Sequence, residues 1–251
     1  MIVVTGSAGY IGNALTKKLT ALGYDIDTWD IRQPMDKPME NVKCVVHLAA
    51  LVRVGESVKR PLDYYDTNVT GTLNVIRAFP NAKMVFASTG AAFSPDSPYG
   101  HSKVMAEQIV KDSCDEYTIF RFYNVGGGSP TNPEGLPLCI EEAKKSKKFT
   151  LFGDDYDTKD GTCVRDYIHV DDITDALVRA VEQPAAMTDY EPLGSGKSYT
   201  VKEYIDAYKS KYGEHLFDVE IGERRKGDLP VSEVPFVSEF MTPTKTLEEI
   251  V

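Results

Sequence analysis

Tyr99 and Lys103 are four positions apart, so a helix would carry both side chains on one face. A free tyrosine, whose pKa is about 10, is a poor base at neutral pH. A lysine one turn away, together with a second positive charge from a bound cofactor, would favour the phenolate and make general-base catalysis feasible. The pair follows an apolar run that ends in Ser88 and Thr89. From that strand end, Thr89 or Ser88 could hydrogen-bond a reacting hydroxyl group, although Thr89 could also merely cap a turn.

Three glycines, Gly6, Gly9 and Gly12, follow the first apolar run of the chain. In dinucleotide-binding folds such a turn joins a strand to a helix. Gly6 allows the tight turn, Gly9 lets the backbone approach a pyrophosphate, and Gly12 lets helix and strand pack closely. The phosphates would meet the free N–H groups at the helix start, where Tyr10 and Ile11 lie. We interpret the motif as a dinucleotide site rather than a plain glycine-rich turn.

Asp30 ends the second apolar run, close to the position roughly 20 residues after the glycine turn where an acidic residue binds adenosine ribose. A carboxylate there would repel a 2′-phosphate, so the sequence favours NAD over NADP. Arg32 lies near enough to weaken this preference, and Asp30 could also be a solvated strand end.

Leu48, Ala49 and Ala50 follow another apolar run and would reach the same edge of the sheet. Small residues there would let a cofactor lie close to the backbone. We interpret His47 as a packed strand histidine. The sequence contains no paired catalytic carboxylates, no Ser-His-Asp set and no metal-ligand spacing, so no metal site is expected.

Alternating strands and helices are needed to position these residues, and such alternation is typical of a parallel sheet. The expected strands are residues 2–4, 26–29, 42–48, 83–87 and 118–122. The expected helices are residues 11–22, 62–79, 99–112, 140–147, 170–182 and 201–212. The pattern predicts an α/β fold, a Rossmann-type doubly wound sheet with a smaller C-terminal α/β substrate lobe. We expect residues 1–125 and 164–182 in the dinucleotide domain, and 126–163 and 183–251 in the lobe.

Composition limits the partners. The formal charge of −10 argues against nucleic acid. No apolar run approaches the roughly 20 residues that cross a membrane, and the chain starts directly on an apolar strand. The basic run at residues 144–148 is typical of an exposed helix end. The four cysteines form no CxxC pair and indicate thiols in a reducing, cytoplasmic protein.

Motifs along almost the whole chain resemble those of UDP-glucose 4-epimerases, in the NAD-dependent epimerase/dehydratase (extended short-chain dehydrogenase/reductase) family. The resemblance includes residues 5–12, 47–50, 54–57, 64–68 and 121–124, together with Thr89, Tyr99 and Lys103. Its most specific part is FGDDYDTKDGTCVRDYIHV at residues 152–170. Residues 224–230, RRKGDLP, are similar to the family's C-terminal nucleotide-binding motif.

This resemblance implies that bound NAD oxidises and re-reduces a UDP-sugar at C4, interconverting UDP-glucose and UDP-galactose. It implies that Tyr99 is the base, that Lys103 holds the cofactor ribose and that Thr89 aligns the sugar hydroxyl. Asn68 and Tyr123 would contact NAD. The residues expected to hold the UDP-sugar are Asn124, Thr150, Leu151, Phe152, Arg165, Arg225 and Asp228.

Several assignments leave alternatives. Arginines such as Arg165 and Arg225 suit a diphosphate, but they could instead form structural salt bridges. Related dehydratases and decarboxylases have an acidic residue after the position of Thr89, where this chain has Gly90. An NAD(P)-dependent nucleotide-sugar reductase or dehydrogenase remains an alternative, as does a non-catalytic nucleotide-binding regulator. The intact tyrosine and lysine argue against the regulator.

The chain is short after the second strand. Only residues 31–41, which include Pro34 and Pro38, separate Asp30 from the next expected strand. They can hardly form a helix and a strand, so we expect a sheet shortened by one strand. The adenine would then be more exposed, and NAD would exchange more readily.

Two further expectations concern the substrate and the assembly. In the family, the position four residues after the motif aspartate influences the size of the sugar pocket. Here that position is Ser232, whose small side chain predicts that N-acetylated UDP-sugars are also accepted, unless Ser232 lies on the surface. We also expect a homodimer through the helices at residues 62–79 and 99–112.

Overall fold

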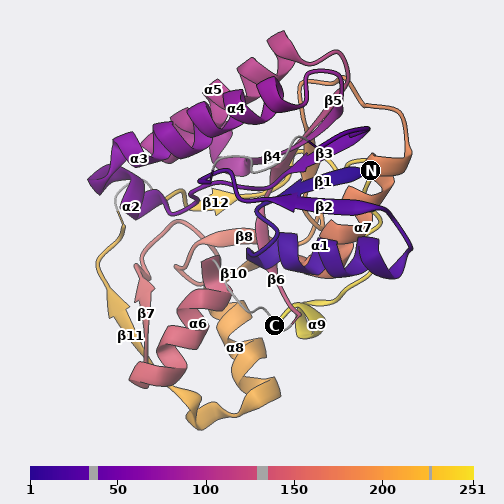
Figure 1. Cartoon of the computed structure of the whole chain (residues 1–251). Helices are drawn as coiled ribbons and strands as arrows, with labels where there is room; N and C mark the ends of the chain where they lie inside the picture. The colour runs from indigo at the N-terminus through magenta and orange to yellow at the C-terminus, as the bar shows by residue number, and fades with distance from the viewer. Residues whose placement is uncertain (34–38, 129–134, 226–227) are drawn as a thin grey trace.

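A six-stranded parallel sheet with the order β2-β1-β3-β4-β5-β9 is the centre of the molecule (Figure 1). The computed structural model describes residues 1–33, 39–128, 135–225 and 228–251. The strands are β1 (Ile2–Thr5), β2 (Ile26–Trp29), β3 (Cys44–His47), β4 (Lys83–Thr89), β5 (Tyr117–Phe122) and β9 (Glu191–Leu193). The next two strands along the chain, β2 and β3, lie on opposite sides of β1. The strand order therefore reverses between β1 and β3, which is where open α/β sheets bind ligands. The predicted Rossmann-type fold is confirmed.

Alternating side chains of the strands enter two separate cores. Val4 and Val46 pack with the helices α1 (Tyr10–Ala21) and α7 (Val170–Glu182) on one face. Val3 and Val45 pack on the other face, which α4 (Gly71–Ala78) and α5 (Pro98–Ser113) cover. Figure 1 shows these two helical layers on either side of the sheet. Burial on both faces explains why the strands are continuous apolar runs.

A third core lies in the part of the chain below the sheet in Figure 1. Here β7 (Lys148–Phe152) pairs in parallel with β11 (Asp218–Gly222), and β8 (Val164–His169) is central to β6, β10 and β12. The remaining elements are β6 (Asn124–Gly126), β10 (Ser198–Thr200), β12 (Val231–Ser232), α6 (Gly135–Ser146), α8 (Val201–Tyr212) and α9 (Leu247–Ile250). Ile173 and Leu177 of α7 join the core of the parallel sheet. The proposed division into two domains remains a prediction.

One predicted helix is wrong as a continuous element. The segment expected at residues 62–79 contains α3 (Pro61–Tyr65), a π-helical turn η1 (Asp66–Thr70) and α4. The wider turn brings Asn68 inside, where its carbonyl oxygen accepts a hydrogen bond from the Thr72 hydroxyl at 2.6 Å. The short helix α2 (Val54–Lys59) and the 3₁₀ turns η2 (Gly90–Ala92) and η3 (Glu214–Leu216) were not predicted. The helices expected at residues 170–182 and 201–212 are confirmed.

The sheet ends at β2. Between Asp30 and β3, the described residues contain no strand, and residues 34–38 lie outside the described part. The Gln33 amide instead closes a turn onto the Asp30 carbonyl oxygen at 2.9 Å. These observations agree with the expected shortening by one strand. Readier NAD exchange remains a prediction.

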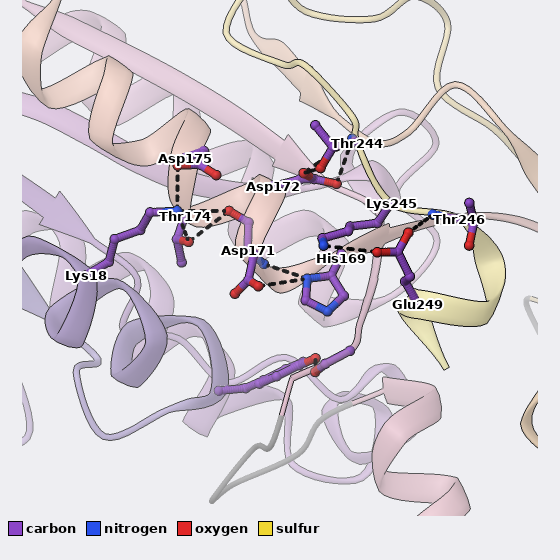
Figure 2. Close-up of polar contacts among 12 residues, drawn as sticks. Lys18, His169, Asp171, Asp172, Thr174, Asp175, Thr244, Lys245, Thr246 and Glu249 are labelled. Carbon is purple, nitrogen blue, oxygen red and sulfur yellow. Dashed lines mark hydrogen bonds and ion pairs between the residues drawn. The ribbon is translucent and has the colours of Figure 1, made fainter. Parts of the chain in front are cut away.

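A segment near the end of the chain, residues 240–244, returns to the core of the parallel sheet before α9 joins the third core. The Phe240 ring packs edge-on against Phe120, with ring centroids 5.3 Å apart. Arg179 of α7 donates to the Phe240 carbonyl oxygen at 2.6 Å. Figure 2 shows the Thr244 hydroxyl directed at the Asp172 carboxylate, at 2.8 Å. The C-terminal segment therefore fastens α7 in place.

Candidate active site

The predicted site residues gather at the carboxyl ends of neighbouring parallel strands. The glycine turn follows β1, Leu48 follows β3, Thr89 ends β4 and Tyr123 follows β5. The side chain of Tyr123 covers Gly90, whose Cβ, if present, would lie 3.2 Å from the ring. In this fold class, that edge is where ligands bind.

Two glycines of the turn are required by close backbone contacts. Gly6 has a φ of +71°, and a Cβ there would lie 2.7 Å from the Ala49 nitrogen. At Gly12 a Cβ would lie 2.1 Å from the Gly6 carbonyl oxygen. Helix α1 begins without a side-chain cap at Gly9 and has no acidic residue in its first turn. The turn therefore fits a pyrophosphate-containing cofactor, which would meet backbone N–H groups and the positive end of the helix.

Tyr10 and Ile11 contribute to this turn through the backbone rather than through their side chains. The Tyr10 hydroxyl donates to the Gly127 carbonyl oxygen at 2.5 Å, and burial raises the pKa of Tyr10 well above its usual value. Ile11 packs against the sheet core. The Tyr10 side chain is therefore engaged within the protein, whereas the Ile11 side chain is only partly buried, and contact of either residue with a cofactor remains a prediction.

Buried polar groups support the loop after β3. The Asn68 amide nitrogen donates to the Leu51 carbonyl oxygen at 3.0 Å and to the Ser102 hydroxyl at 2.9 Å. Its amide oxygen accepts from the Leu51 nitrogen at 2.8 Å. Both amide hydrogens of Asn68 are therefore used within the protein. Asn68 therefore links this loop to α5. Direct contact between Asn68 and NAD remains a prediction.

His47 is packed, as expected. Its ring nitrogens hydrogen-bond the hydroxyls of Thr5 at 2.7 Å and Thr72 at 3.0 Å. Burial, with a smaller contribution from the charge of Lys103, lowers the pKa of His47 to about 3. The imidazole is therefore neutral near pH 7.

The three predicted catalytic residues come together beneath the start of α5. Ser97 caps this helix by accepting from the Gly100 amide at 3.2 Å. Tyr99 and Lys103 then lie on its buried face, and Tyr99 is hydrogen-bonded to Thr89. Thr89 also accepts from the Ala91 amide at 3.2 Å, so it both caps a turn and contacts the tyrosine.

Burial shifts the titration of this pair toward the neutral forms. It raises the pKa of Tyr99 to about 12, although the hydrogen bond with Thr89 acts in the opposite direction. Burial likewise lowers the pKa of Lys103 to about 7, opposed by the negative charge of Glu107. The phenolate was expected to need a cationic cofactor as well as the lysine, and in the protein alone Lys103 does not lower the pKa of Tyr99. Additional positive charge at the site is needed to favour the phenolate.

Asp30 lies at the end of β2 and is paired with Arg32. The guanidinium donates from Nε to Oδ1 at 2.9 Å and from Nη2 to Oδ2 at 2.7 Å. These hydrogen bonds lower the pKa of Asp30. Arg32 thus offsets part of the negative charge that was expected to repel a 2′-phosphate.

The predicted substrate residues line the third core and its rim. The Arg225 guanidinium lies 3.7 Å from the centroid of the Phe152 ring. Arg165 donates to the carbonyl oxygens of Val164 and Leu229, both at 2.8 Å. In the described part of the chain neither arginine forms an ion pair, which disfavours the structural salt-bridge alternative. Both planar cations therefore have no carboxylate partner among the residues that the structure describes.

The other predicted substrate residues differ in exposure. The Asn124 amide donates to the Asp166 carbonyl oxygen at 3.2 Å, and the Asp228 nitrogen donates to the Arg225 carbonyl oxygen at 3.2 Å. In β7 the Thr150 side chain is exposed, whereas Leu151 is buried in the core. Leu151 could therefore contact a ligand only through its backbone and not through its side chain.

Ser232 is placed in the sheet of β8. It belongs to β12 and pairs with Arg165 in parallel register. Its side chain is half-buried. Whether Ser232 borders the sugar or lies at the surface remains a prediction.

Sequence reasoning missed an ionic network behind the catalytic pair. Glu107 of α5 binds Arg121 of β5, with Arg121 Nη2 at 2.7 Å from Oε2, and both side chains are largely buried. The spacing of Glu107, four residues after Lys103, was a signal that could have identified it.

We predict that Gly12→Ala abolishes measurable NAD binding, because its Cβ would collide with the backbone of Gly6. The substitution should also lower the free energy of unfolding by about 1–3 kcal/mol. Calorimetric titration with NAD and urea unfolding measure the two effects. Gly55→Ala is the matched control, because a Cβ at this helical position meets nothing within 4 Å. NAD affinity in Gly12→Ala equal to that of the unmodified protein would refute the proposed role of the turn.

Comparisons with known proteins agree with this geometry. The model of the NAD dependent epimerase/dehydratase family matches residues 2–194. UDP-glucose 4-epimerase of Rhizobium meliloti is 37% identical, over 90% of this chain and 86% of that protein. UDP-glucose 4-epimerase of Lactobacillus helveticus is 33% identical, with the same coverage of 90% and 86%.

Solved structures give the same result. UDP-glucose 4-epimerase from Bifidobacterium longum, in complex with NAD⁺ and UDP, has a TM-score of 0.85 and 28% identity, covering 99% of this chain and 95% of that chain. The UDP-Glc/GlcNAc 4-epimerase from Campylobacter jejuni has a TM-score of 0.76 and 28% identity, covering 99% and 96%. With its glycine turn and buried tyrosine–lysine pair, the chain belongs to the NAD-dependent epimerase/dehydratase family.

Proposed function

We propose that this protein interconverts UDP-glucose and UDP-galactose with NAD as its cofactor. One observation carries the proposal: the buried Tyr99 and Lys103, with the half-buried Thr89, lie at the same sheet edge as the glycine turn. The chain is also 37% identical to a UDP-glucose 4-epimerase over most of its length. When bound, NAD supplies the reversible oxidation of the sugar at C4.

Tyr99 is the group that takes the proton of the sugar 4-hydroxyl and later returns it. Thr89, which is already hydrogen-bonded to Tyr99, aligns that hydroxyl. Lys103 supplies positive charge one helical turn away and binds the cofactor ribose. Both Tyr99 and Lys103 are buried, so few water molecules compete for the proton.

We assign the UDP part of the substrate to the third core. Arg165 and Arg225 are cations without carboxylate partners among the described residues, and planar guanidinium groups suit a diphosphate. Asp228 suits the ribose hydroxyls. In this division of labour, residues 1–125 and 164–182 form the NAD-binding domain and residues 126–163 and 183–251 form the UDP-sugar lobe, with Asn124 and Arg165 at the boundary contributing to the UDP-sugar site.

Among the described residues, no helix is long and apolar enough to cross a bilayer. All four cysteines are free thiols, which suits the reducing cytoplasm that we propose as the location. Cell fractionation tests this location, and recovery of the protein outside the cytoplasm would contradict it.

Tyr99→Phe tests the assignment of the base. We expect kcat for conversion of UDP-galactose, followed by NMR of the sugar product, to fall at least roughly 10²-fold. UDP binding should be retained, because the substitution removes one oxygen atom from the tyrosine. Tyr212→Phe is the matched control, since Tyr212 is half exposed on α8. Near-normal turnover in Tyr99→Phe would refute the assignment, and net release of NADH would instead indicate a dehydrogenase.

Ser232→Tyr tests the breadth of the sugar pocket. We infer from the small side chain beside Arg165 that N-acetylated UDP-sugars are accepted. A tyrosine should suppress UDP-N-acetylglucosamine conversion and spare UDP-galactose, because overpacking a tight site costs about 1–3 kcal/mol. Ser113→Tyr, at the exposed end of α5, is the matched control. The inference fails if the unmodified protein ignores acetylated sugars, or if the tyrosine variant handles both as before.

We also propose a homodimer through the helical layer formed by residues 62–79 (α3, η1 and α4) and α5, against which α2 also packs. This layer exposes Val58 (65%), Leu62 (74%) and Met105 (49%) on helices that pack against one another. Leu62→Glu should raise the dissociation constant roughly tenfold or more, measured by sedimentation equilibrium. Leu22→Glu, on exposed Leu22 after α1, is the control. A monomeric unmodified protein, or equal effects of both variants, would contradict the proposed interface.

A further inference from the structure

Glu107 continues the catalytic face of α5. It lies one turn beyond Lys103 and two turns beyond Tyr99, which brings all three side chains to the buried side of the helix. Only 3% of Glu107 is exposed. A carboxylate at such depth requires partners.

These partners come from the two strands that line the site. The Ser88 hydroxyl donates to Oε1 of Glu107. Arg121 donates from Nε to Oε1 at 2.9 Å and from Nη2 to Oε2 at 2.7 Å. Tyr190 covers the guanidinium, with its ring centroid 4.1 Å away. Because Ser88 precedes Thr89, the carboxylate ties α5 to the strand end that contacts Tyr99.

The other titratable groups around Lys103 are neutral near pH 7. On β3, His47 is neutral because burial lowers its pKa to about 3. Burial also raises the pKa values of Tyr99 on α5 and Tyr64 on α3 to about 12. Among the described residues, Glu107 supplies the opposing charge that raises the pKa of Lys103 against the effect of burial. Arg121, the cation on β5, is ion-paired with that carboxylate, with Nη2 2.7 Å from Oε2.

We propose that Glu107 is a positioning residue for the reaction, and that its carboxylate, clamped by Arg121 and Ser88, keeps Lys103 cationic in the site. An opposite charge stabilises a buried ammonium group that desolvation alone would tend to neutralise. The catalytic consequence rests on the proposed epimerase function. The effect on the protonation of Lys103 is independent of that function.

Glu107→Gln keeps the shape of the side chain and removes its charge. Lys103 acts in its protonated form, so a lower pKa should move the alkaline limb of the kcat–pH profile to lower pH. We expect a shift of roughly one pH unit or more. Glu107→Asp keeps the charge but disturbs the hydrogen bonds, so kcat should fall while the limb stays in place. A residue with a merely structural role would leave the limb unmoved in both variants.

NMR titration of ¹³Cε-lysine-labelled protein reads Lys103 directly, with its signal assigned by its absence in Lys103→Arg. The pKa of Lys103 should fall in Glu107→Gln and stay unchanged in Asp112→Asn, an exposed control on the same helix. If the single variant does not fold, the double variant Glu107→Gln/Arg121→Met avoids leaving Arg121 unpaired and should still show a fall in the Lys103 pKa, but a smaller one, because removing the Arg121 cation acts in the opposite direction. An unchanged Lys103 pKa would overturn the proposal, whether or not the protein is an epimerase.

Discussion

Burial of ionisable side chains against the carboxyl edge of the sheet is the constraint on which the site depends. Tyr99 and Lys103 are almost inaccessible to water, and an isolated charge in such surroundings is strongly disfavoured. The protein compensates within a few residues, through the hydrogen bond of Thr89 to the tyrosine and the carboxylate of Glu107 beyond the lysine. The same burial makes the groups sensitive to added charge. A ligand that brings positive charge to this edge therefore changes their protonation more than it would in water.

The glycine turn illustrates a second use of close packing. The backbone of Gly6 approaches Ala49 so closely that no side chain fits between β1 and the loop after β3. That approach lies at the point where the strand order reverses, and it leaves the start of α1 uncovered by any side-chain cap. Asn68 holds the other end of the same loop against α5. The cofactor edge and the catalytic helix are thus joined by a short, internally bonded segment.

Much of this could be predicted from local pattern. Residues 26–29 and 170–182 form their elements with the expected bounds, because apolar periodicity and the turns around them act over a few residues. The glycine turn and the Tyr99–Lys103 spacing were also visible, because their meaning depends on position along a strand or helix.

Contacts between segments far apart in the chain could not be predicted from the sequence. The π-helical turn at residues 66–70 is favoured by the burial of Asn68 against Leu51, a contact between separate segments. The tyrosine pKa depends on how deeply α5 packs, and the Glu107–Arg121 pair joins a helix to a strand. Spacing alone could not show that Asp30 is already paired with Arg32.

The unit formed by β8 and α7 joins the third core to the core of the parallel sheet. Arg165 lies near the start of β8, and His169 at its end caps α7 by accepting from the Asp171 amide at 3.0 Å. His169 also lies so close to Gly127, after β6, that a Cβ there would be 2.0 Å from the ring. Asp172 lies in the same first turn of α7, and its carboxylate accepts a hydrogen bond from the Thr244 hydroxyl (Figure 2). Helix α7 in turn packs with α1 and the core of the parallel sheet, so these contacts connect β8 to the helix that follows the glycine turn.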